Sequence, residues 1–492
     1  MSISQNLQKD FFKPGLDDVL QRIATLTKKQ SQSIDVSRKE RFSQYFTEGA
    51  VAKQMASVLS VGGGARIGDH GAGTGILGAT VLAHAVDTMP LKGKPFTLKA
   101  YEIDELLHAS FARCMEEVSD FAAGLCKPAP NISLKGDFTE LANDLCFGRG
   151  HEQLDAVILN PPYKKLNQGT ALAQLMRSNL VSTPNLYAAF IVLSVLMLRP
   201  GGQMVAIVPR SFTNGTYFRG FRTWLRQQGA IDWFVRYKRR SNVFRGDNVL
   251  QENVTFRFVR GVKQCDRVRV SLCDSPESPP VFESMVPTRD VFPEETDIIY
   301  VPANAAELNA LHKMRQLPYS ADELGLSIST GKLEDFRVRE YLCHSIPDGK
   351  WAPVIYSQHW ERGSTQMAWS SSTSNGKPAC LKLNSDTIKK TIPRGNYVLV
   401  KRISANDDRT GRCNPCVLTE DMDLPGDVWS VDNHLQVISA TKGKMSRSLA
   451  GELAAYLESQ DVDHVLRLVS GTTQLNRADL MQLRFPESCY DC

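Results

Sequence analysis

The sequence contains no apolar segment long enough to cross a lipid bilayer. Its longest apolar run, residues 188–197, falls well short of the ~20 residues that a membrane-spanning helix requires. The first residues, MSISQNLQKDFFK, are polar and charged where a signal peptide would be apolar. We therefore expect a cytoplasmic protein that makes no contact with a membrane.

A disulfide framework and a strong net charge are also absent. The 11 cysteines are odd in number and scattered, which is typical of a protein in the reducing cytosol. Two Cys-x-x-Cys pairs, Cys413 with Cys416 and Cys489 with Cys492, lie about 70 residues apart and lack the glycine-rich context of a zinc knuckle. We therefore expect no bound metal. The net charge of +5 is too small to identify a partner on its own.

Length and composition predict a folded protein with more than one domain. The chain has 492 residues, about three times the length of a typical domain. Its 42% of hydrophobic and 23% of charged residues exclude wholesale disorder. Between residues 41 and 270, short apolar strand patterns alternate with helix patterns. This alternation predicts an α/β fold with a mostly parallel, twisted sheet.

The segments before residue 41 and after residue 270 differ from this region in residue pattern and composition. Apolar residues recur at spacings of three and four between Leu16 and Leu26, which predicts a helical arm within residues 1–40. Residues 271–300 are rich in Pro, Ser and Glu, the composition of a linker or crossover. From residue 301 to residue 492, short strand patterns between polar loops predict a second, irregular α+β domain with few helices.

Basic residues concentrate between residues 210 and 270. This stretch holds 14 Lys or Arg against four Asp or Glu, and aromatic residues such as Tyr217, Trp224 and Trp233 are interleaved with them. Cations together with aromatic rings are typical of nucleic-acid contact through phosphates and stacked bases. The alternative, weighted equally, is a solvated rim whose aromatic side chains lie in the core.

Three loops that follow predicted strands carry the residues of a nucleotide-like site. The first, DHGAGTG at residues 69–75, has glycines that permit a tight turn and a close approach of a ligand to a helix N-terminus. Glu102 follows the next strand, where a carboxylate can bind two ribose hydroxyls. Asp137 and Phe138 follow a third strand, where they suit an adenine amino group and its ring. For each acid, capping a helix is the alternative role.

A strand that ends in Asn160-Pro161-Pro162-Tyr163 indicates the chemistry. Because two prolines fix the backbone and lack N–H donors, the Asn160 side-chain oxygen and the Pro161 carbonyl can accept both hydrogens of a planar NH₂ group. Tyr163 can stack on the ring that carries this group. Such a site orients the nitrogen lone pair toward an electrophilic methyl group without a strong base. A plain turn is the alternative interpretation.

With these motifs in this order, the chain resembles the class I S-adenosylmethionine-dependent methyltransferases that act on amino groups. Among them it looks most like the gamma-class N6-adenine DNA methyltransferases of restriction–modification systems. The segment Tyr45-Phe46-Thr47-Glu48 is similar to the one that precedes the glycine loop in that family. The resemblance implies a Rossmann-like catalytic domain over residues 41–270, a target recognition domain over residues 301–492, and S-adenosyl-L-methionine as cofactor.

The resemblance also implies roles for individual residues. The residues implied to contact the cofactor are Phe46, Thr47, Asp69, Gly71, Gly73, Gly75, Glu102, Asp137 and Phe138. Those implied to hold the target base are Asn160, Pro161, Pro162 and Tyr163, with Phe244 on the other face of the base. Candidate contacts to the DNA backbone are Lys238, Arg239 and Arg240. In the second domain, Gly331-Lys332, Lys401-Arg402 and Arg409–Arg412 are candidate contacts to a DNA groove or to phosphates, and a solvated loop is the favoured alternative for each of them. Glu48 and His70 depart from the family, in which proline is usual at the first position and frequent at the second.

We therefore expect a monomeric enzyme that methylates a flipped-out adenine in a specific sequence of double-stranded DNA, which protects that DNA from a cognate restriction endonuclease. Cytosine N4, a guanine of RNA and a protein glutamine carry comparable nitrogens and stay open as substrates. A DNA-specificity subunit with a vestigial cofactor site is the alternative without catalysis. For His434, in a motif often found in such recognition domains, a structural hydrogen bond is the default role.

Overall fold

The computed structural model describes residues 15–238, 252–361, 367–370, 376–404, 411–470 and 474–490. The chain divides into two compact units, Met1–Val301 and Pro302–Cys492. Within the described ranges, none of the helices combines the length and the apolar character needed to span a membrane.

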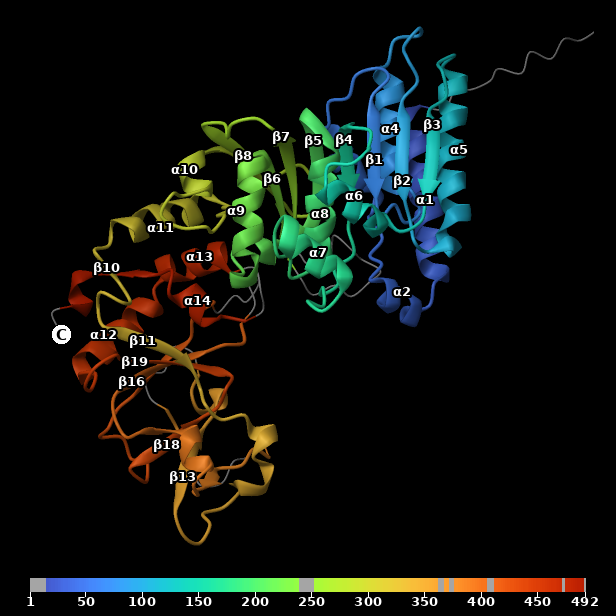
Figure 1. The fold of residues 1–492 in the computed structure, drawn as a ribbon. Coiled ribbons are helices and arrows are strands. Elements are labelled where there is room, and N and C mark those ends of the chain that lie inside the picture. The colour runs from blue at the N-terminus through green and yellow to red at the C-terminus, as the bar shows by residue number, and fades with distance from the viewer. Residues whose placement is uncertain are drawn as a thin grey trace, which may run out of the picture. The chain divides into compact units, whose positions relative to one another are not determined.

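A nine-stranded sheet forms the centre of the first unit, as far as its residues are described (Figure 1). Its spatial order is β3-β2-β1-β4-β5-β7-β6-β8-β9. Neighbouring strands from β3 to β5 are parallel, β7 is antiparallel to both neighbours, and β9 is antiparallel to β8. The strands are β1 (Arg66–His70), β2 (Thr97–Tyr101), β3 (Asn131–Lys135), β4 (Leu154–Leu159), β5 (Leu198–Pro209), β6 (Gly229–Tyr237), β7 (Asn253–Arg260), β8 (Arg267–Cys273) and β9 (Phe282–Pro287). The prediction of a mostly parallel sheet is confirmed.

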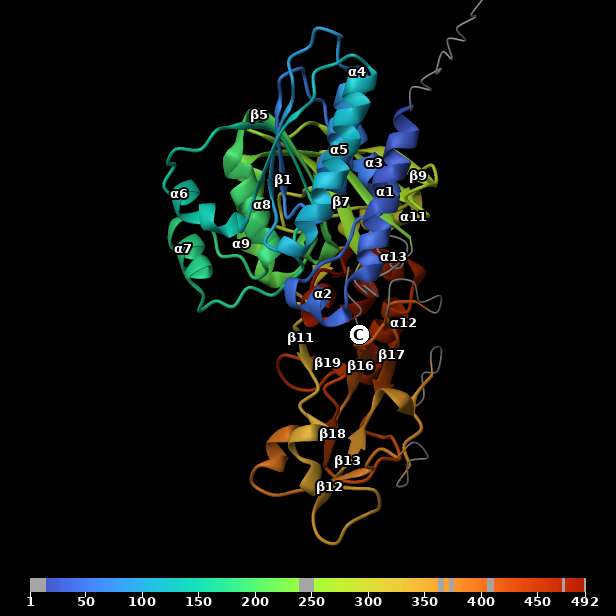
Figure 2. The same ribbon diagram turned by 90° about the vertical axis from the view of Figure 1, so that its right-hand side faces the viewer.

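Helices cover both faces of this sheet (Figures 1 and 2). On one face, α1, α3, α4 and α5 share a core with strand residues such as Ile67, Leu98 and Ile158. On the other face, α8 packs against β1 and β5, and α9 packs against β6. The helices are α1 (Leu16–Ser33), α2 (Val36–Phe42), α3 (Gly49–Ser57), α4 (Ile76–Thr88), α5 (His108–Gly124), α6 (Ala142–Cys146), α7 (Ala171–Asn179), α8 (Leu186–Met197), α9 (Arg219–Gln228) and α10 (Thr288–Val291).

The segments that flank the predicted catalytic domain belong to this unit. The predicted N-terminal helix is α1, and it docks by burying Val19, Leu20 and Ile23 in the core. Residues 271–300, by contrast, are not the linker that their composition predicted, because β9 and α10 lie within them and extend the sheet. The Pro- and Ser-rich residues 274–281 form the connection between β8 and β9. Their composition marks a turn between paired strands and not a boundary between domains.

The second unit contains three smaller sheets within its described residues. Their orders are β11-β19-β16-β17, β12-β14-β13-β18-β15 and β10-β20. The strands are β10 (Tyr319–Ser320), β11 (Leu326–Thr330), β12 (Leu342–Cys343), β13 (Trp351–Ile355), β14 (Cys380–Lys382), β15 (Thr391–Pro393), β16 (Tyr397–Lys401), β17 (Pro415–Leu418), β18 (Val428–Val431), β19 (Leu435–Ala440) and β20 (Arg484–Phe485). The helices are α11 (Ala305–Gln316), α12 (Arg447–Leu457), α13 (Gln460–Val469) and α14 (Arg477–Leu480). The α+β character and the low helical content of this unit were predicted, although the positions of these helices were not.

Candidate active site

The glycine loop joins β1 to α4 and depends on backbone conformations that other residues rarely adopt. Gly71, Gly73 and Gly75 have φ angles of 84°, 57° and 84°. The N–H groups of Gly71 and Ala72 donate to the Tyr101 carbonyl at 3.0 and 2.8 Å, which ties the loop to the end of β2. At Gly75, an added Cβ would lie 2.7 Å from the Phe111 ring. The loop is therefore held close to both the neighbouring strand and α5.

A cavity lies where β1, β2, β3 and β4 end, at the edge where parallel strands place their carboxyl termini. Its lining residues are Phe42, Ser43, Gln44, Tyr45, Phe46, Gly71, Gly73, Tyr101, Glu102, Ile103, Gly136, Asp137, Phe138, Asn160, Pro162 and Phe190. The structure thus brings most of the predicted cofactor residues together with the Asn-Pro-Pro corner. The predicted site residues that do not line the cavity are Thr47, Asp69, Gly75, Pro161 and Tyr163.

Glu102 links the end of β2 to the glycine loop. One carboxylate oxygen accepts the Gly73 N–H at 2.8 Å, and the other accepts the Asp104 N–H at 2.7 Å. The side chain is buried, and this burial raises the pKa of the carboxyl group. Because each oxygen has a second lone pair, Glu102 can still accept hydrogen bonds from a ligand.

Asp137 and Phe138 form another wall of the cavity. The Asp137 Oδ1 atom caps a short 3-10 helix by accepting the N–H and the hydroxyl of Thr139, both at 2.8 Å. The capping role considered from the sequence is therefore present, and the Asp137 Oδ2 atom has no hydrogen-bond partner within the described ranges. The Phe138 ring stacks on His70 with a centroid distance of 4.0 Å. Burial lowers the pKa of His70 to about 3, so the imidazole is neutral and serves as a flat support.

Asp69 lies behind the cavity and not on its wall. Its side chain is fully buried, and its Oδ2 atom accepts the Gly78 N–H in the first turn of α4 at 2.8 Å. The Oδ1 atom is also buried, with no hydrogen-bond partner among the residues that the structure describes. Burial, opposed by this hydrogen bond and reinforced by the charge of Glu102, raises the pKa of Asp69 to about 7.

This pKa predicts a pH-dependent cost to stability. The unfolded carboxyl group has its ordinary pKa of 3.8, so the folded chain binds the proton more tightly, and stability falls as the pH rises toward about 7. We expect the Asp69→Asn variant to lack this trend. Its urea midpoint, measured without cofactor, should rise relative to wild type between about pH 5 and pH 8, because one pKa unit corresponds to about 1.4 kcal/mol. Parallel profiles for the two proteins would contradict the assignment.

Asn160 is held in one orientation by the segment between α2 and α3. Its Nδ2 group donates to the Tyr45 carbonyl at 2.7 Å and to the Thr47 hydroxyl at 3.0 Å. Both hydrogens of the amide are therefore engaged. The Oδ1 atom is buried and accepts no hydrogen bond in the described part of the chain. The corner thus presents an unused acceptor with a fixed direction, next to the glycine loop.

Tyr163 stands beside this corner with its hydroxyl anchored. The hydroxyl donates to the Ile207 carbonyl near the end of β5 at 3.1 Å, and burial raises the pKa of the phenol. The ring packs against Tyr45 with a centroid distance of 5.4 Å. The side chain is partly exposed, so the ring is fixed without being enclosed.

The segment before α3 is also tied to the cofactor side of the cavity, through contacts that sequence reasoning missed. Asp104 is buried and accepts hydrogen bonds from the Arg38 guanidinium, at 2.5 and 3.1 Å, and from the Gln44 amide at 2.8 Å. These partners are more than 55 residues apart in sequence. Asp104 also caps the short 3-10 helix Glu105–Leu107. This capping position is the only role of Asp104 that could have been noticed from the neighbouring sequence.

Most of the cations between residues 210 and 270 that the structure describes are engaged within the first unit. Arg210 pairs with Glu252 and Arg257 pairs with Asp232, each at 2.7 Å. The buried aromatic residues in the described part of this stretch are Phe212, Phe218, Phe221, Trp233, Phe234, Tyr237, Phe256 and Phe258. These rings cannot stack on bases, so the alternative interpretation with aromatic side chains in the core applies to them.

Of the four residues Lys238, Arg239, Arg240 and Phe244, predicted to contact the DNA backbone or the flipped base, the structure describes Lys238. It forms a half-exposed ion pair with Asp274 at 2.7 Å, which a phosphate could replace at little cost. Arg239, Arg240 and Phe244 lie outside the described residues. Within those residues, no three His, Cys, Asp or Glu side chains are grouped to hold a metal ion.

Comparisons with known proteins agree with this geometry. Residues 113–244 match the Eco57I restriction-modification methylase family. Type II methyltransferase M.PstI of Providencia stuartii is 30% identical over 93% of this chain and 89% of its own length. Type II methyltransferase M.BsuBI of Bacillus subtilis is 30% identical over 92% of this chain and 89% of its own.

Solved structures that align with this chain include a putative class I S-adenosylmethionine-dependent methyltransferase from Listeria monocytogenes and restriction–modification proteins. The type IIG restriction endonuclease BpuSI aligns with a TM-score of 0.43 at 13% identity, over 96% of this chain and 61% of its own. A type I restriction–modification methyltransferase subunit from Streptococcus thermophilus aligns with a TM-score of 0.37 at 18% identity, over 56% of this chain and 54% of its own.

Proposed function

Because this chain belongs to the type II methyltransferases of restriction–modification systems, we propose that it methylates the N6 amino group of a target adenine in double-stranded DNA. The modification would protect a specific sequence from a cognate restriction endonuclease. The observation that carries the proposal is the buried Oδ1 atom of Asn160, which has no hydrogen-bond partner among the described residues while its Nδ2 group is fixed by Tyr45 and Thr47 at the edge of the cavity.

The residues around the cavity fit S-adenosyl-L-methionine. Glu102 would bind the ribose hydroxyls with its remaining lone pairs, and the Oδ2 atom of Asp137 would accept from the adenine amino group of the cofactor. Phe138, supported by His70, offers a flat apolar surface to the ring. An added Cβ at Gly71 would lie 3.9 Å from the Asn160 carbonyl oxygen, so a ligand above the loop lies next to the catalytic corner. When bound, this cofactor supplies an electrophilic methyl group on a sulfonium.

The protein's own contribution is orientation and electrostatics. A flipped-out base would place its NH₂ group against Asn160 Oδ1 and the Pro161 carbonyl, which accept one hydrogen each. Both acceptors would then raise the electron density on the nitrogen and stabilise the positive charge that develops on it as the N–C bond forms and the S–C bond to the departing thioether breaks. The methylated nitrogen would then lose one of its two protons to solvent. Tyr163 would hold the base by stacking, while its hydroxyl stays on Ile207. No side chain has to remove a proton before the methyl group is transferred.

Thr47 acts in this scheme as a positioning residue for Asn160. The Thr47→Val variant keeps the shape but removes the acceptor of the Nδ2–H group, so we expect kcat to fall about 10-fold while KM for DNA and cofactor changes little. The Thr47→Ser variant keeps the hydroxyl and should retain most of the wild-type kcat. Steady-state kinetics of both variants test this. Equal losses in the two variants, or a change confined to KM, would contradict the positioning role.

The proposed substrate is tested by the identity of the methylated base. Purified protein, DNA that does not carry the modification and S-adenosyl-L-methionine with a deuterated methyl group are incubated, and the DNA is digested to nucleosides for mass spectrometry. We expect the label in N6-methyladenine. Label in N4-methylcytosine would reassign the base, and absence of label from DNA would refute the proposed function. Modification-sensitive sequencing of the same DNA then gives the position within the recognition sequence.

A further inference from the structure

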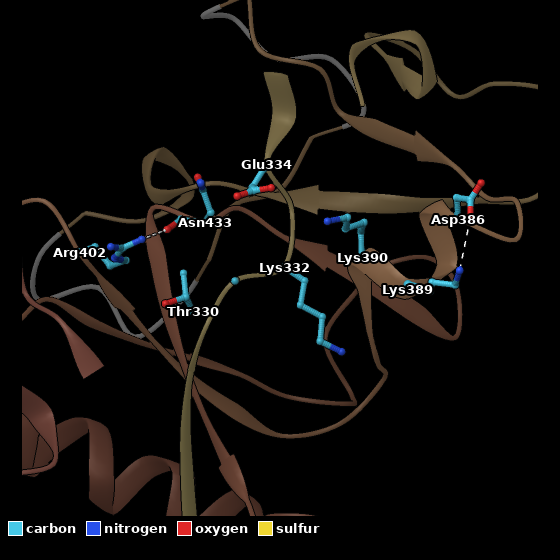
Figure 3. A pocket seen from close by; sticks show the side chains of 9 residues that line it. Thr330, Lys332, Glu334, Asp386, Lys389, Lys390, Arg402 and Asn433 are labelled. Atoms are coloured by element: carbon cyan, nitrogen blue, oxygen red, sulfur yellow. Dashed lines mark hydrogen bonds and ion pairs between the residues drawn. The ribbon is translucent and has the colours of Figure 1, made fainter. Parts of the chain in front are cut away.

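The second unit contains a hollow with a basic lining, apart from the cavity of the first unit (Figure 3). Its volume is about 690 Å³. The lining residues are Thr330, Gly331, Lys332, Glu334, Asp386, Lys389, Lys390, Arg402 and Asn433. They come from the end of β11, the short helix Thr387–Lys390, the end of β16 and the turn between β18 and β19. Four segments that are distant in sequence therefore meet around this hollow.

The two acidic side chains of the lining are already neutralised. Glu334 pairs with Arg337 at 2.8 Å. Asp386 pairs with Lys389 at 3.3 Å (Figure 3). Each pair forms within one short segment, so neither acid is available to the other cations of the hollow. The negative charge of the lining is thus balanced locally.

Three cations of the lining are not paired with a carboxylate among the described residues. Lys332 donates to the Thr391 carbonyl at 3.3 Å, and Arg402 donates to the Asn433 carbonyl at 2.5 Å. Neither of them, nor Lys390, has a carboxylate partner among the residues that the structure describes. Lys390 and Arg402 are partly buried, which strengthens their attraction for an anion.

The backbone around these cations is closely packed. An added Cβ at Gly331 would lie 2.1 Å from the Asp432 carbonyl oxygen, so the two segments can approach only because this residue is glycine. The Gly331 N–H donates to the Leu435 carbonyl at 2.9 Å. The buried Arg402 Nε atom has no hydrogen-bond partner within the described ranges, so the guanidinium keeps an unused N–H donor.

We propose that Lys332, Lys390 and Arg402 bind phosphates of the DNA duplex that is methylated. The inference rests on the proposed function, which makes duplex DNA the substrate. Phosphates recur along each strand, so cations that arise from separate segments can each meet a different one. The planar guanidinium of Arg402 can donate two parallel N–H hydrogen bonds to one phosphate, whereas each lysine ammonium acts as a point charge. Such contacts fix the position of the protein on DNA without reading its sequence.

The test compares two triple variants. The first combines Lys332→Ala, Lys390→Ala and Arg402→Ala. The control combines Lys313→Ala, Lys442→Ala and Lys444→Ala, which remove the same charge from exposed positions elsewhere in the second unit. Binding of a fluorescently labelled DNA duplex of mixed sequence is measured by anisotropy over a series of NaCl concentrations, and a second, unrelated duplex is measured in parallel.

We expect the first variant to bind both duplexes at least ~10-fold more weakly than wild type at low salt. The plot of log K against log salt should become shallower by about 0.9 for each phosphate that the variant no longer neutralises, whereas the control should match wild type. An unchanged affinity and slope would overturn the proposal. So would weaker binding confined to one of the two sequences, because that result indicates recognition of bases.

Two further measurements separate the remaining outcomes. If the first variant does not fold, a double variant that combines Lys332→Gln with Lys390→Gln is tested in its place. Its plot of log K against log salt should show about two thirds of the change in slope expected for the triple variant. Calorimetry with inorganic phosphate tests for a free anion site, and phosphate binding together with undiminished DNA binding by the variant would overturn the proposal. A wild type that binds duplex DNA without methylating it would refute the proposed function and leave this comparison valid.

Discussion

Replacing Asn160 with alanine is expected to lower the single-turnover rate of methyl transfer by about 100-fold or more. The variant loses the acceptor that holds the amino group of the target base, together with the hydrogen bonds to Tyr45 and Thr47 that fix it. Binding of DNA and of cofactor should change little, because the Asn160 side chain is proposed to contact only the amino group of the target base. Rapid-quench measurements at saturating DNA give the rate, and anisotropy and calorimetry give the two affinities.

The matched control is Asn179→Ala, which removes the same amide from the exposed C-terminal end of α7. It should transfer methyl groups at the wild-type rate. A near-normal single-turnover rate for Asn160→Ala would show that this side chain does not hold the reacting amine. A lower rate explained entirely by weaker DNA binding would show that it anchors the substrate and has no role in the chemical step.

The second large effect is expected for Glu102→Ala, which should weaken binding of S-adenosyl-L-methionine by about 100-fold. The carboxylate makes hydrogen bonds of 2.8 and 2.7 Å to the N–H groups of Gly73 and Asp104, so its removal loosens the glycine loop as well as the proposed ribose contact. Calorimetric titration of the purified protein with the cofactor measures the affinity.

Glu105→Ala provides the control for this prediction, because Glu105 carries the same charge three residues later and is exposed. We expect its cofactor affinity to equal that of wild type. Glu102→Gln should fall between the two, since the amide can accept one of the two N–H bonds but presents a donor to the other. If Glu102→Ala binds cofactor as tightly as Glu105→Ala, Glu102 has no part in the site.

The sheet of the first unit could be predicted because its elements carry strong local signals. Apolar residues 156–159 and 204–208 lie in β4 and β5, and the apolar run after Asn185 forms α8. Parallel strands place their carboxyl ends at one edge, so the glycine loop, Glu102 and Asn160 could be expected to meet there. Their convergence on one cavity follows from this topology.

Some elements that sequence reasoning missed did carry local signals. α13 begins after Ser459, whose hydroxyl caps its first turn, and Val462, Val465, Leu466 and Val469 recur at helical spacing, so this helix could have been predicted. The contacts of Arg38 and Gln44 with Asp104, and the meeting of Lys390 with Arg402 at one hollow, join residues that are distant in sequence. Neither periodicity nor spacing encodes such contacts.

The most direct test of the catalytic corner is an experimental structure of the protein with a non-reactive cofactor analogue and a duplex that contains its methylation site. The account predicts an extruded adenine whose N6 atom lies about 3 Å from both Asn160 Oδ1 and the Pro161 carbonyl oxygen, with Tyr163 against its ring. An extruded base whose amino group contacts neither oxygen, or a corner that stays filled by protein side chains when DNA is bound, would contradict it.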